Sequence, residues 1–343
     1  MKNIVIAAVL FLGAAGAAPA ATIADAYSSF YAFGDSLSDD GKFGTLDPPS
    51  LDGRFSNGPV WVEHIAQLFK SAGRDTGNLA LGGATAGNVN LNPAGPLSTF
   101  GGQIATFAGS LAAGVGLPTK ILPTVEFSLN PPSPGANPLV SILFGPNDIF
   151  QGFNPVAAAN SVANGIRAIA SIGANFDDFL VMSLPDIGAT PAFAGAGSAG
   201  ATAASNAFNA QLALNVAGLR SEGLNIIEFD TESVFQEILA DINSGTFKFG
   251  IFDARTPCTA SIGAPLDPTF SNPGSCLDLG INPNTLLFVD GVHPNGVVHG
   301  LVADRAIAAV ENHLAAVPLP ATLPMLILAV GGIGFIARRR QTA

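Results

Sequence analysis

The sequence predicts an α/β protein in which one parallel β-sheet carries helices on both faces. Two observations support this fold class. Five short apolar runs are bounded by turn residues, which is typical of buried strands. Stretches with the apolar spacing of amphipathic helices lie between and after these runs, and strands that alternate with helices favour a parallel sheet covered on both sides. Such a sheet places its sites in loops at the carboxyl ends of its strands.

The elements follow in chain order. The predicted strands cover residues 30–33, 78–81, 139–144, 179–184 and 225–229. The predicted helices cover residues 60–69, 160–172, 205–220 and 299–315. Three segments rich in Gly, Pro and Asn are interpreted as insertions, at 85–98, 117–138 and 245–285. Residues 194–205 are a run of small residues, either a mobile loop or the lead-in to a helix. One domain over residues 25–316 is the simplest organisation.

The bulk composition excludes one class of partner. Of 343 residues, 48% are hydrophobic and 11% are charged, so a sizeable core can form. Four of the 14 basic residues lie near the two ends of the chain, so the body from 21 to 316 carries 25 acids against 10 bases, a net charge of -15. Nucleic-acid binding needs lysine and arginine against phosphate, so nucleic acid is excluded as a partner.

Both ends of the chain are typical of targeting segments. Residues 1–20 combine a lysine, an apolar run and a small-residue exit, which predicts a secretory signal peptide; a core helix is the alternative. Residues from about 319 to 337 form an apolar span of roughly 28 Å as a helix, close to the thickness of a bilayer core. The arginines at 338–340 stay cytoplasmic by the positive-inside rule. We therefore expect an exported protein on the periplasmic or cell-surface side, anchored to the membrane by its tail.

The tail, residues 317–343, also resembles the VPLPA variety of the bacterial PEP-CTERM sorting signals. The resemblance lies in the order of three parts, the motif at 317–321, the apolar span and the three arginines. It implies a sorting protease of the membrane that cuts near the proline motif, and bacteria whose exported proteins often associate with extracellular polysaccharide. The sequence leaves open whether the tail is retained or cleaved.

Two cysteines, Cys258 and Cys276, lie in the predicted exported body. An oxidising compartment favours a disulfide between them, and two free thiols are the alternative. Closing a loop of about 17 residues contributes ~3 kcal/mol in the chain-entropy model. The cysteines and the four scattered histidines show no metal-ligand spacing, so no metal site is expected.

One serine lies where a parallel sheet would expose it. Ser36 follows the first predicted strand directly, in the sequence GDSLSDD. A serine needs a base to become nucleophilic near neutral pH, and a histidine is the usual one. The segment FVDGVHP supplies Asp290 and His293, spaced so that the carboxylate accepts from imidazole Nδ1 and Nε2 takes the serine proton. The alternatives are a turn serine and a loop histidine bonded to backbone.

A tetrahedral intermediate also needs hydrogen-bond donors aimed at its oxyanion. Gly83 ends a predicted strand, and its backbone N–H can approach a ligand closely because glycine has no side chain. Asn147 ends another strand, and its side-chain amide can donate. The Ser36 backbone N–H is the third candidate. Taken alone, each of these residues is more typical of a turn or a loop.

Together the segments resemble the sequence blocks of the GDSL or SGNH hydrolase family, lipase-like bacterial branch. The blocks are residues 34–39, 78–85, 145–148 and 290–294. The resemblance implies a flavodoxin-like three-layer α/β/α sandwich and the hydrolysis of carboxylic esters without metal or cofactor. It also implies that Ser36 is the nucleophile, His293 the general base and Asp290 its orienting partner, with Ser36, Gly83 and Asn147 as the oxyanion hole. The GxSxG elbow of ordinary α/β-hydrolases is absent from the chain.

Other polar residues near these blocks receive simpler roles. Asp35, Asp39 and Asp148 are expected to cap backbone and fix loops. His64 and His299 fall on predicted helix surfaces and are interpreted as structural. Two further residues, Arg54 and Asn57, lie in a loop flanked by Gly and Pro and are candidates for lining the acyl or alcohol pocket.

The leading hypothesis is an exported serine esterase that forms an acyl-enzyme. Its substrate is either a lipid acyl ester, which the 24 phenylalanines favour, or an acetylated glycan, which the sorting tail favours. The rival from another class is a catalytically silent surface or matrix scaffold displayed through the tail. The sequence does not give the oligomeric state.

Overall fold

A computed structural model describes residues 22–173, 175–260 and 275–316 of the chain. The signal peptide expected at 1–20 and the membrane helix expected at about 319–337 lie outside the described residues. Within the described ranges, no helix has both the length and the apolar character that crossing a bilayer requires.

The main sheet has five parallel strands. They are β1 (Ser29–Gly34), β2 (Asp75–Asn78), β5 (Pro138–Leu143), β6 (Asp178–Met182) and β7 (Asn225–Phe229). Their order across the sheet is β2-β1-β5-β6-β7, with every neighbouring pair parallel. Numbered within this sheet alone, the order is 2-1-3-4-5, which is that of flavodoxin. The order reverses between β1 and β5, and open α/β sheets bind ligands at such a switch point.

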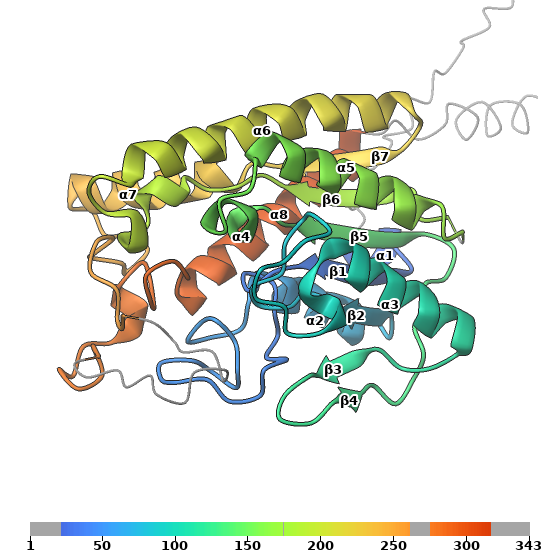
Figure 1. The fold of residues 1–343 in the computed structure, drawn as a ribbon, viewed down its shortest axis with the longest axis horizontal. Helices are drawn as coiled ribbons and strands as arrows, with labels where there is room; N and C mark the ends of the chain where they lie inside the picture. The colour runs from blue at the N-terminus through green and yellow to red at the C-terminus, as the bar shows by residue number, and fades with distance from the viewer. Residues whose placement is uncertain (1–21, 174, 261–274, 317–343) are drawn as a thin grey trace, which may run out of the picture.

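Helices cover both faces of the sheet (Figure 1). One layer contains α2 (Trp61–Ser71) and α8 (Gly296–Ala316), with α1 (Ile23–Ala26) and α7 (Thr231–Ser244) packed beside them. The other contains α3 (Phe100–Ala113), α5 (Pro155–Ala170) and α6 (Ser198–Ser221), together with the short α4 (Pro146–Phe150). The α/β class and the parallel sheet are therefore as the sequence predicted.

Aromatic packing on the central strand shows why both layers are needed. Successive side chains of a strand point to opposite faces. Tyr31 and Phe33 pack against Phe107 of α3, with ring centroids 4.8 and 5.6 Å away, whereas Phe30 packs against Phe69 of α2 at 5.5 Å. Every residue of β1 is buried, as expected for a strand covered on both faces.

The second predicted strand needs correction. Its expected range, 78–81, begins where β2 ends. Leu79 and Leu81 still donate backbone hydrogen bonds to β1, at 2.8 and 3.1 Å, but they already belong to the buried turn that leads into the site. The actual strand, DTGN, is a half-buried edge strand without an apolar pattern, so periodicity did not reveal it.

The insertions contain structure that the sequence analysis did not predict. Residues 117–138 include a two-stranded antiparallel sheet of β3 (Pro118–Lys120) and β4 (Glu126–Phe127), which projects beside α3 (Figure 1). The small-residue run at 194–205 becomes part of α6 from Ser198 onward, which decides between the two alternatives for most of it. Four 3₁₀ turns complete the described part of the chain, η1 (Pro96–Ser98), η2 (Ile187–Ala189), η3 (Pro191–Phe193) and η4 (Pro283–Thr285).

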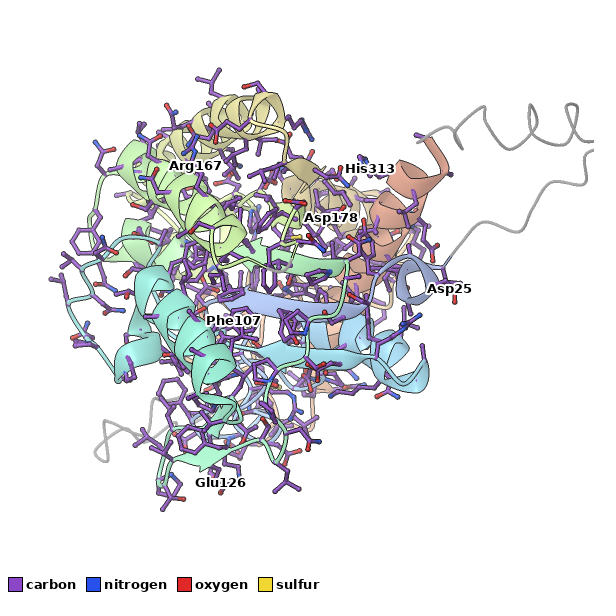
Figure 2. All side chains as sticks on the ribbon, turned by 90° about the vertical axis from the view of Figure 1, so that its right-hand side faces the viewer. Asp25, Phe107, Glu126, Arg167, Asp178 and His313 are labelled. Atoms are coloured by element: carbon purple, nitrogen blue, oxygen red, sulfur yellow. A yellow bond between two sulfur atoms is a disulfide. The ribbon has the colours of Figure 1, made fainter. Side chains whose placement is uncertain are left out.

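The edge of the sheet opposite the site is held by polar contacts. Asn225, the first residue of β7, accepts a hydrogen bond at 2.8 Å from Nε2 of His313 near the end of α8, and its amide nitrogen donates to Asp178 at the start of β6. Figure 2 shows Asp178 and His313 close together at this edge. Helix α8 therefore runs from the carboxyl edge of the sheet, where the site lies, to the amino edge.

Candidate active site

The turn after β1 holds Ser36 in a fixed position. The carbonyl of Asp35 accepts the N–H of Ser38 at 3.0 Å, and its carboxylate Oδ1 accepts the N–H of Leu37 at 3.0 Å. Asn78 donates its side-chain amide to the Ser38 carbonyl at 2.8 Å, and Trp61 donates Nε1–H to the Ser38 hydroxyl at 3.2 Å. The serine turn is thus anchored to the end of β2 and to α2.

The structure brings the three predicted catalytic side chains into one hydrogen-bonded chain. His293 Nε2 lies 2.8 Å from Ser36 Oγ, and His293 Nδ1 lies 2.8 Å from Asp290 Oδ2. The serine is almost buried, with 7% of its surface exposed. These distances lie within the range for hydrogen bonds that pass a proton between nucleophile and base.

The contacts of the Asp290 carboxylate stabilise its charged form. Its Oδ1 accepts the backbone N–H groups of Val292 and His293 at 2.9 and 2.8 Å. Burial acts to raise the pKa of Asp290, but the His293 imidazole and these donors outweigh burial and hold the pKa below its usual value. A charged carboxylate on Nδ1 favours the tautomer that leaves Nε2 free to accept the serine proton.

The predicted oxyanion donors come from two further loops at the same edge of the sheet. Gly83 has φ +78°, a conformation that favours glycine, and open space lies where a Cβ would stand. Asn147, in the first turn of α4, donates one amide hydrogen to the Ala84 carbonyl at 3.0 Å, so its second hydrogen remains for another acceptor. Among the described residues, no protein acceptor binds the backbone N–H of Ser36 or Gly83.

Two acids fix the loops that carry these donors. Asp39 is fully buried and accepts the Gly82 N–H at 2.7 Å, which links the serine turn to the Gly82–Gly83 turn. Asp148 accepts the N–H groups of Ala86 and Gly87 at 2.8 and 3.2 Å, which links α4 to the loop after Gly83. Burial raises the pKa of both carboxyl groups. The loop-fixing role expected for these acids matches their contacts.

Asp35 differs from these two acids because only half of its carboxyl group is bonded. It is fully buried, and its Oδ2 has no hydrogen-bond partner among the described residues. Burial raises the pKa of Asp35 to about 7, because the Leu37 N–H and the charge of His293 offset burial only in part and the charge of Asp148 adds to it. The carboxyl beside the serine therefore titrates near neutral pH.

An aromatic wall beside the histidine was not singled out from the sequence. The ring of Phe55 lies 4.9 Å from the His293 ring, and Phe43 packs edge-on against Phe55 at 5.7 Å. A Cβ on Gly82 would come within 2.2 Å of the Phe55 ring, so only glycine fits there. Periodicity gives no signal for a single aromatic residue in a loop, so Phe55 was not identified.

The two candidate pocket residues have other partners. Arg54 makes two hydrogen bonds to Glu63 of α2, at 2.7 and 2.8 Å. Asn57 accepts the Gly296 N–H at the start of α8 and donates to Asn284. These contacts join the loop to two helices, and a role of either residue in substrate binding stays a prediction.

The expected surface position of His299 is wrong. His299 lies on α8 with 2% of its surface exposed, and its Nδ1 accepts the Trp61 N–H at 3.3 Å. Its Nε2 and that of the half-buried His64 are both buried without a hydrogen-bond partner among the described residues. Helices α2 and α8 pack on each other here, so a helix position that looked exposed is covered by its neighbour.

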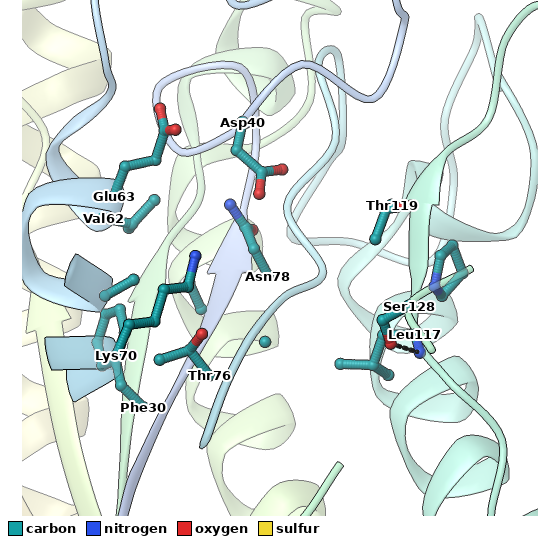
Figure 3. Close-up of a pocket in the computed structure, with 14 residues that line it drawn as sticks. Phe30, Asp40, Val62, Glu63, Lys70, Thr76, Asn78, Leu117, Thr119 and Ser128 are labelled. Carbon is teal, nitrogen blue, oxygen red and sulfur yellow. Dashed lines mark hydrogen bonds between the residues drawn. The ribbon is translucent and has the colours of Figure 1, made fainter. Parts of the chain in front are cut away.

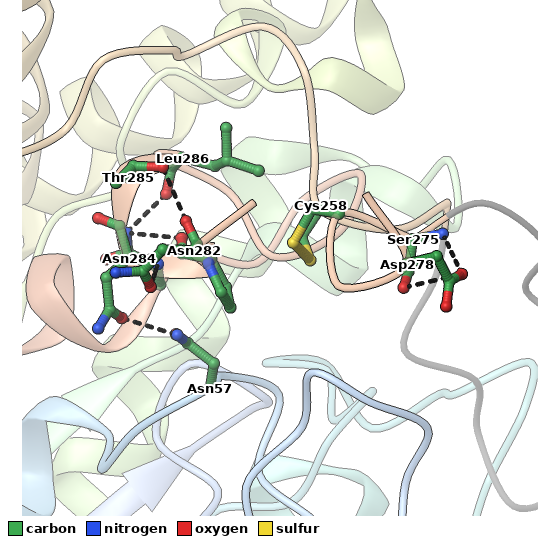
Figure 4. The surroundings of a disulfide bond; sticks show 11 residues. Asn57, Cys258, Ser275, Asp278, Asn282, Asn284, Thr285 and Leu286 are labelled. Atoms are coloured by element: carbon green, nitrogen blue, oxygen red, sulfur yellow. Dashed lines mark hydrogen bonds between the residues drawn. A yellow bond between two sulfur atoms is a disulfide. The ribbon is translucent and has the colours of Figure 1, made fainter. Parts of the chain in front are cut away.

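Cys258 and Cys276 form a disulfide (Figure 4), and both are buried with Leu286 in a small separate cluster. The Cys258 N–H donates to the Phe288 carbonyl at 3.2 Å, and the next residue donates to Val289 at 3.0 Å. The disulfide-linked segment therefore lies along the residues that directly precede Asp290.

One sizeable pocket lies away from the catalytic residues, between α2, β2 and β3 (Figure 3), with a volume of about 290 Å³. Asp40, Lys70 and Asn78 contribute polar groups, and Val62 and Leu117 contribute apolar walls. None of the three predicted catalytic side chains lines it. In the part of the chain that the structure describes, no group of three or more His, Cys, Asp and Glu side chains is arranged to hold a metal ion.

Two parts of the chain match known protein families. Residues 30–306 match the GDSL-like lipase/acylhydrolase family. The chain belongs to this family. Residues 316–341 match the PEP-CTERM protein-sorting motif. The GDSL match covers all four sequence blocks, which supports the resemblance seen in the sequence. The second match supports a PEP-CTERM sorting tail, whereas its assignment to the VPLPA variety stays a prediction.

Curated relatives of this GDSL protein include an acyltransferase and an esterase at modest identity. It is 28% identical over 332 residues to a phosphatidylcholine-sterol acyltransferase of Aeromonas hydrophila, covering 84% of this chain and 91% of the relative. It is 29% identical over 307 residues to the esterase EstA of Pseudomonas aeruginosa, covering 81% of this chain and 46% of the relative. The chain thus spans about half the length of that esterase. Family and relatives place it among hydrolases of the esterase type.

Solved structures show a likeness at low identity. A member of the lipolytic G-D-S-L family from Veillonella parvula is 15% identical, with a TM-score of 0.43 and coverage of 82% of this chain and 96% of that one. A variant of the acetyl-xylooligosaccharide esterase Axe2 from Geobacillus is 12% identical, with a TM-score of 0.44 and coverage of 82% and 94%.

Proposed function

We propose that this GDSL protein is an exported serine esterase that cleaves carboxylic esters through an acyl-enzyme. One observation carries the proposal: Ser36 Oγ lies 2.8 Å from His293 Nε2 while Nδ1 of the same ring lies 2.8 Å from Asp290. A hydroxyl, an imidazole and a carboxylate in this order supply a nucleophile, its base and the group that orients the base.

The reaction follows from these positions. His293 takes the Ser36 proton as Oγ attacks the ester carbonyl carbon, and the backbone N–H groups of Ser36 and Gly83 and the amide of Asn147 bind the oxyanion that forms. His293 then gives its proton to the departing alcohol, which leaves the acyl group on Ser36. Water, activated by the same imidazole, releases the acid. Loss of a single oxyanion donor typically costs ~10²–10³ in rate.

Export and anchoring rest on separate support. The sorting motif follows the described domain directly, and the disulfide in the body suits an oxidising compartment. The body is thus proposed to work outside the cytoplasm, tethered by its tail until a sorting protease acts on it.

The deciding experiment compares the wild-type protein with Ser36→Ala on p-nitrophenyl acetate and butyrate. We expect kcat to fall by at least about 10³-fold, because the nucleophile is lost while binding groups remain. Ser221→Ala is the matched control, because Ser221 is an exposed serine at the end of α6. Undiminished hydrolysis by pure Ser36→Ala would remove Ser36 from the reaction. A fluorophosphonate label tests the silent-scaffold alternative, since a scaffold would not react.

A further inference from the structure

Two apolar features lie beside the catalytic residues, and they differ in the size of group they can take. The first is a cavity behind the serine and histidine turns, lined by Leu37, Val292 and Pro294 together with Phe235 and Leu239 of α7. It leaves only about 30 Å³ of space, which is room for about two water molecules. In this conformation it takes no more than a methyl or ethyl group.

The second feature is a pair of stacked phenylalanine rings, one of them on the same helix as Asn147. Phe150 follows Asn147 by three residues on α4, so the two side chains share one face of that helix. The Phe150 ring stacks on Phe193 with a centroid separation of 5.5 Å and an interplanar angle of 10°. Phe150 keeps 39% of its surface exposed although it is a large apolar residue. An apolar ring therefore stands next to the proposed oxyanion donor and remains available for contact.

The pair also connects to the loop of the catalytic base. Ala192, which precedes Phe193, donates its N–H to the carbonyl of Gly291 at 2.8 Å. A Cβ on Gly291 would lie 3.3 Å from the Ala192 side chain, so the two segments are in direct contact. Gly291 lies between Asp290 and His293 in the sequence. The rings thus join the segment that carries Asn147 to the segment that carries the base.

Apolar surface continues away from the rings along the neighbouring loop. The N–H of Leu91 donates to the side chain of Gln151 at 2.7 Å, directly after Phe150 in the chain. Leu91 and Val89 are 61% and 59% exposed. Exposed apolar side chains therefore lie in the loop that contacts the residue after Phe150.

We propose that the Phe150–Phe193 pair binds the acyl chain of the substrate, and that the enzyme prefers esters of medium-length fatty acids to acetyl esters. The proposal rests on the esterase function proposed above and names its substrate class. Each methylene that leaves water on an apolar surface improves binding by up to about fourfold, so a chain four methylenes longer than acetyl gains about 15-fold if half of its surface is covered.

The test is a chain-length series of p-nitrophenyl acetate, butyrate, hexanoate and octanoate with wild type, Phe150→Ala and Phe193→Ala. We expect kcat/KM for hexanoate to fall about tenfold or more in both variants while acetate changes less than about twofold. Phe150→Leu keeps apolar surface and is expected to retain most of the hexanoate activity. Phe127→Ala is the matched control, because Phe127 is a similarly exposed phenylalanine on β4. Leu239→Phe, which narrows the small cavity, is expected to leave the series unchanged.

Three outcomes would overturn the proposal. The first is an equal loss of acetate and hexanoate activity in the ring variants, which would mean general damage to the site. The second is no loss of either activity, or a wild-type preference for acetate. The third is a dependence on chain length in the alcohol part of methyl to hexyl esters but not in the acyl part. Failure of the esterase function itself looks different, because Ser36→Ala would then hydrolyse the whole series as wild type does.

Discussion

Two buried side chains, Asp35 next to Ser36 and His299 on α8, are expected to set the pH dependence of the free energy of unfolding. Asp35 and His299 are both buried, and burial moves their pKa values in opposite directions, to about 7 for the acid and to about 3 for the histidine. For His299, the positive charges of His293 and His64 act in the same direction as burial. Between about pH 4 and 6.5, the native state thus holds a proton on Asp35 that the unfolded state has lost, and it lacks one on His299 that the unfolded state has gained.

The two residues are therefore expected to give opposite pH slopes of stability. Neutral His299 contributes stability that is complete above about pH 6.5 and is lost as pH falls, whereas protonated Asp35 contributes stability that is complete below about pH 4 and is lost as pH rises. Relative to wild type, Asp35→Asn should make the free energy of unfolding rise with pH by about 1.4 kcal/mol per unit in this window. His299→Gln should shift the slope by a similar amount the other way. Urea unfolding at several pH values measures both.

Parallel curves for the two variants and the wild type would contradict this assignment. Asp304→Asn is the matched control, since Asp304 is an exposed acid on the same helix as His299. It is expected to leave the slope unchanged.

The proposed catalytic side chains could be predicted from the sequence because their chemistry restricts the residue types and their spacing. A nucleophile after a buried strand and an Asp three residues before a His are local patterns, so Ser36, Asp290 and His293 were visible. Phe150 and Phe193 were not, because they meet only through folding and a single phenylalanine in a short helix or a 3₁₀ turn has no distinctive pattern. The burial of His299 was missed for the same reason, since the helix that covers it is distant in the chain.

Among the elements, the disulfide segment has the clearest link to the site. Backbone hydrogen bonds from Cys258 and its neighbour hold residues 288–289, and Asp290 follows directly. The disulfide therefore restrains residues 288–289, which lead into the loop that carries Asp290 and His293. Reducing conditions should affect activity through this route.

Replacing both cysteines, as Cys258→Ser with Cys276→Ser, is expected to lower the free energy of unfolding by about 2–4 kcal/mol. We also expect kcat to fall several-fold, because Asp290 loses part of its backbone support. Thermal unfolding and p-nitrophenyl butyrate kinetics measure the two effects, and wild type treated with dithiothreitol should behave like the double variant. A variant that loses stability but keeps full kcat below its melting range would separate the disulfide from the catalytic loop.

Elements with strong apolar runs were predictable, and those without them were not. Strands β1, β5, β6 and β7 are mostly buried, so each contains a run of apolar residues. The edge strand β2 and the small sheet of β3 and β4 are half exposed and short, so neither has such a run. Helix α3 begins with Phe-Gly-Gly and contains many small residues, so its sequence predicts a helix only weakly. Tertiary packing stabilises this helix in the folded protein.

At the scale of the whole molecule, the net negative charge should make the protein hydrolyse anionic esters less efficiently than neutral ones. The body from 21 to 316 carries 25 acids and 10 bases. We expect kcat/KM for an anionic ester such as p-nitrophenyl hemisuccinate to rise several-fold as NaCl increases from about 20 to about 300 mM, because salt screens its repulsion. The neutral butyrate ester is the control and should change little. An equal response of both esters would show that the field of the protein does not reach the site.

The direction of α8 has a consequence for where the enzyme works. The helix starts three residues after His293 and ends at Ala316, where the sorting motif begins, and 21 residues of α-helix extend about 32 Å. The Ser36–His293 pair and the start of the sorting motif thus lie toward opposite edges of the sheet. A domain tethered to a membrane by this end would hold its candidate active site on the side away from the lipid, where it faces molecules that arrive from the surroundings.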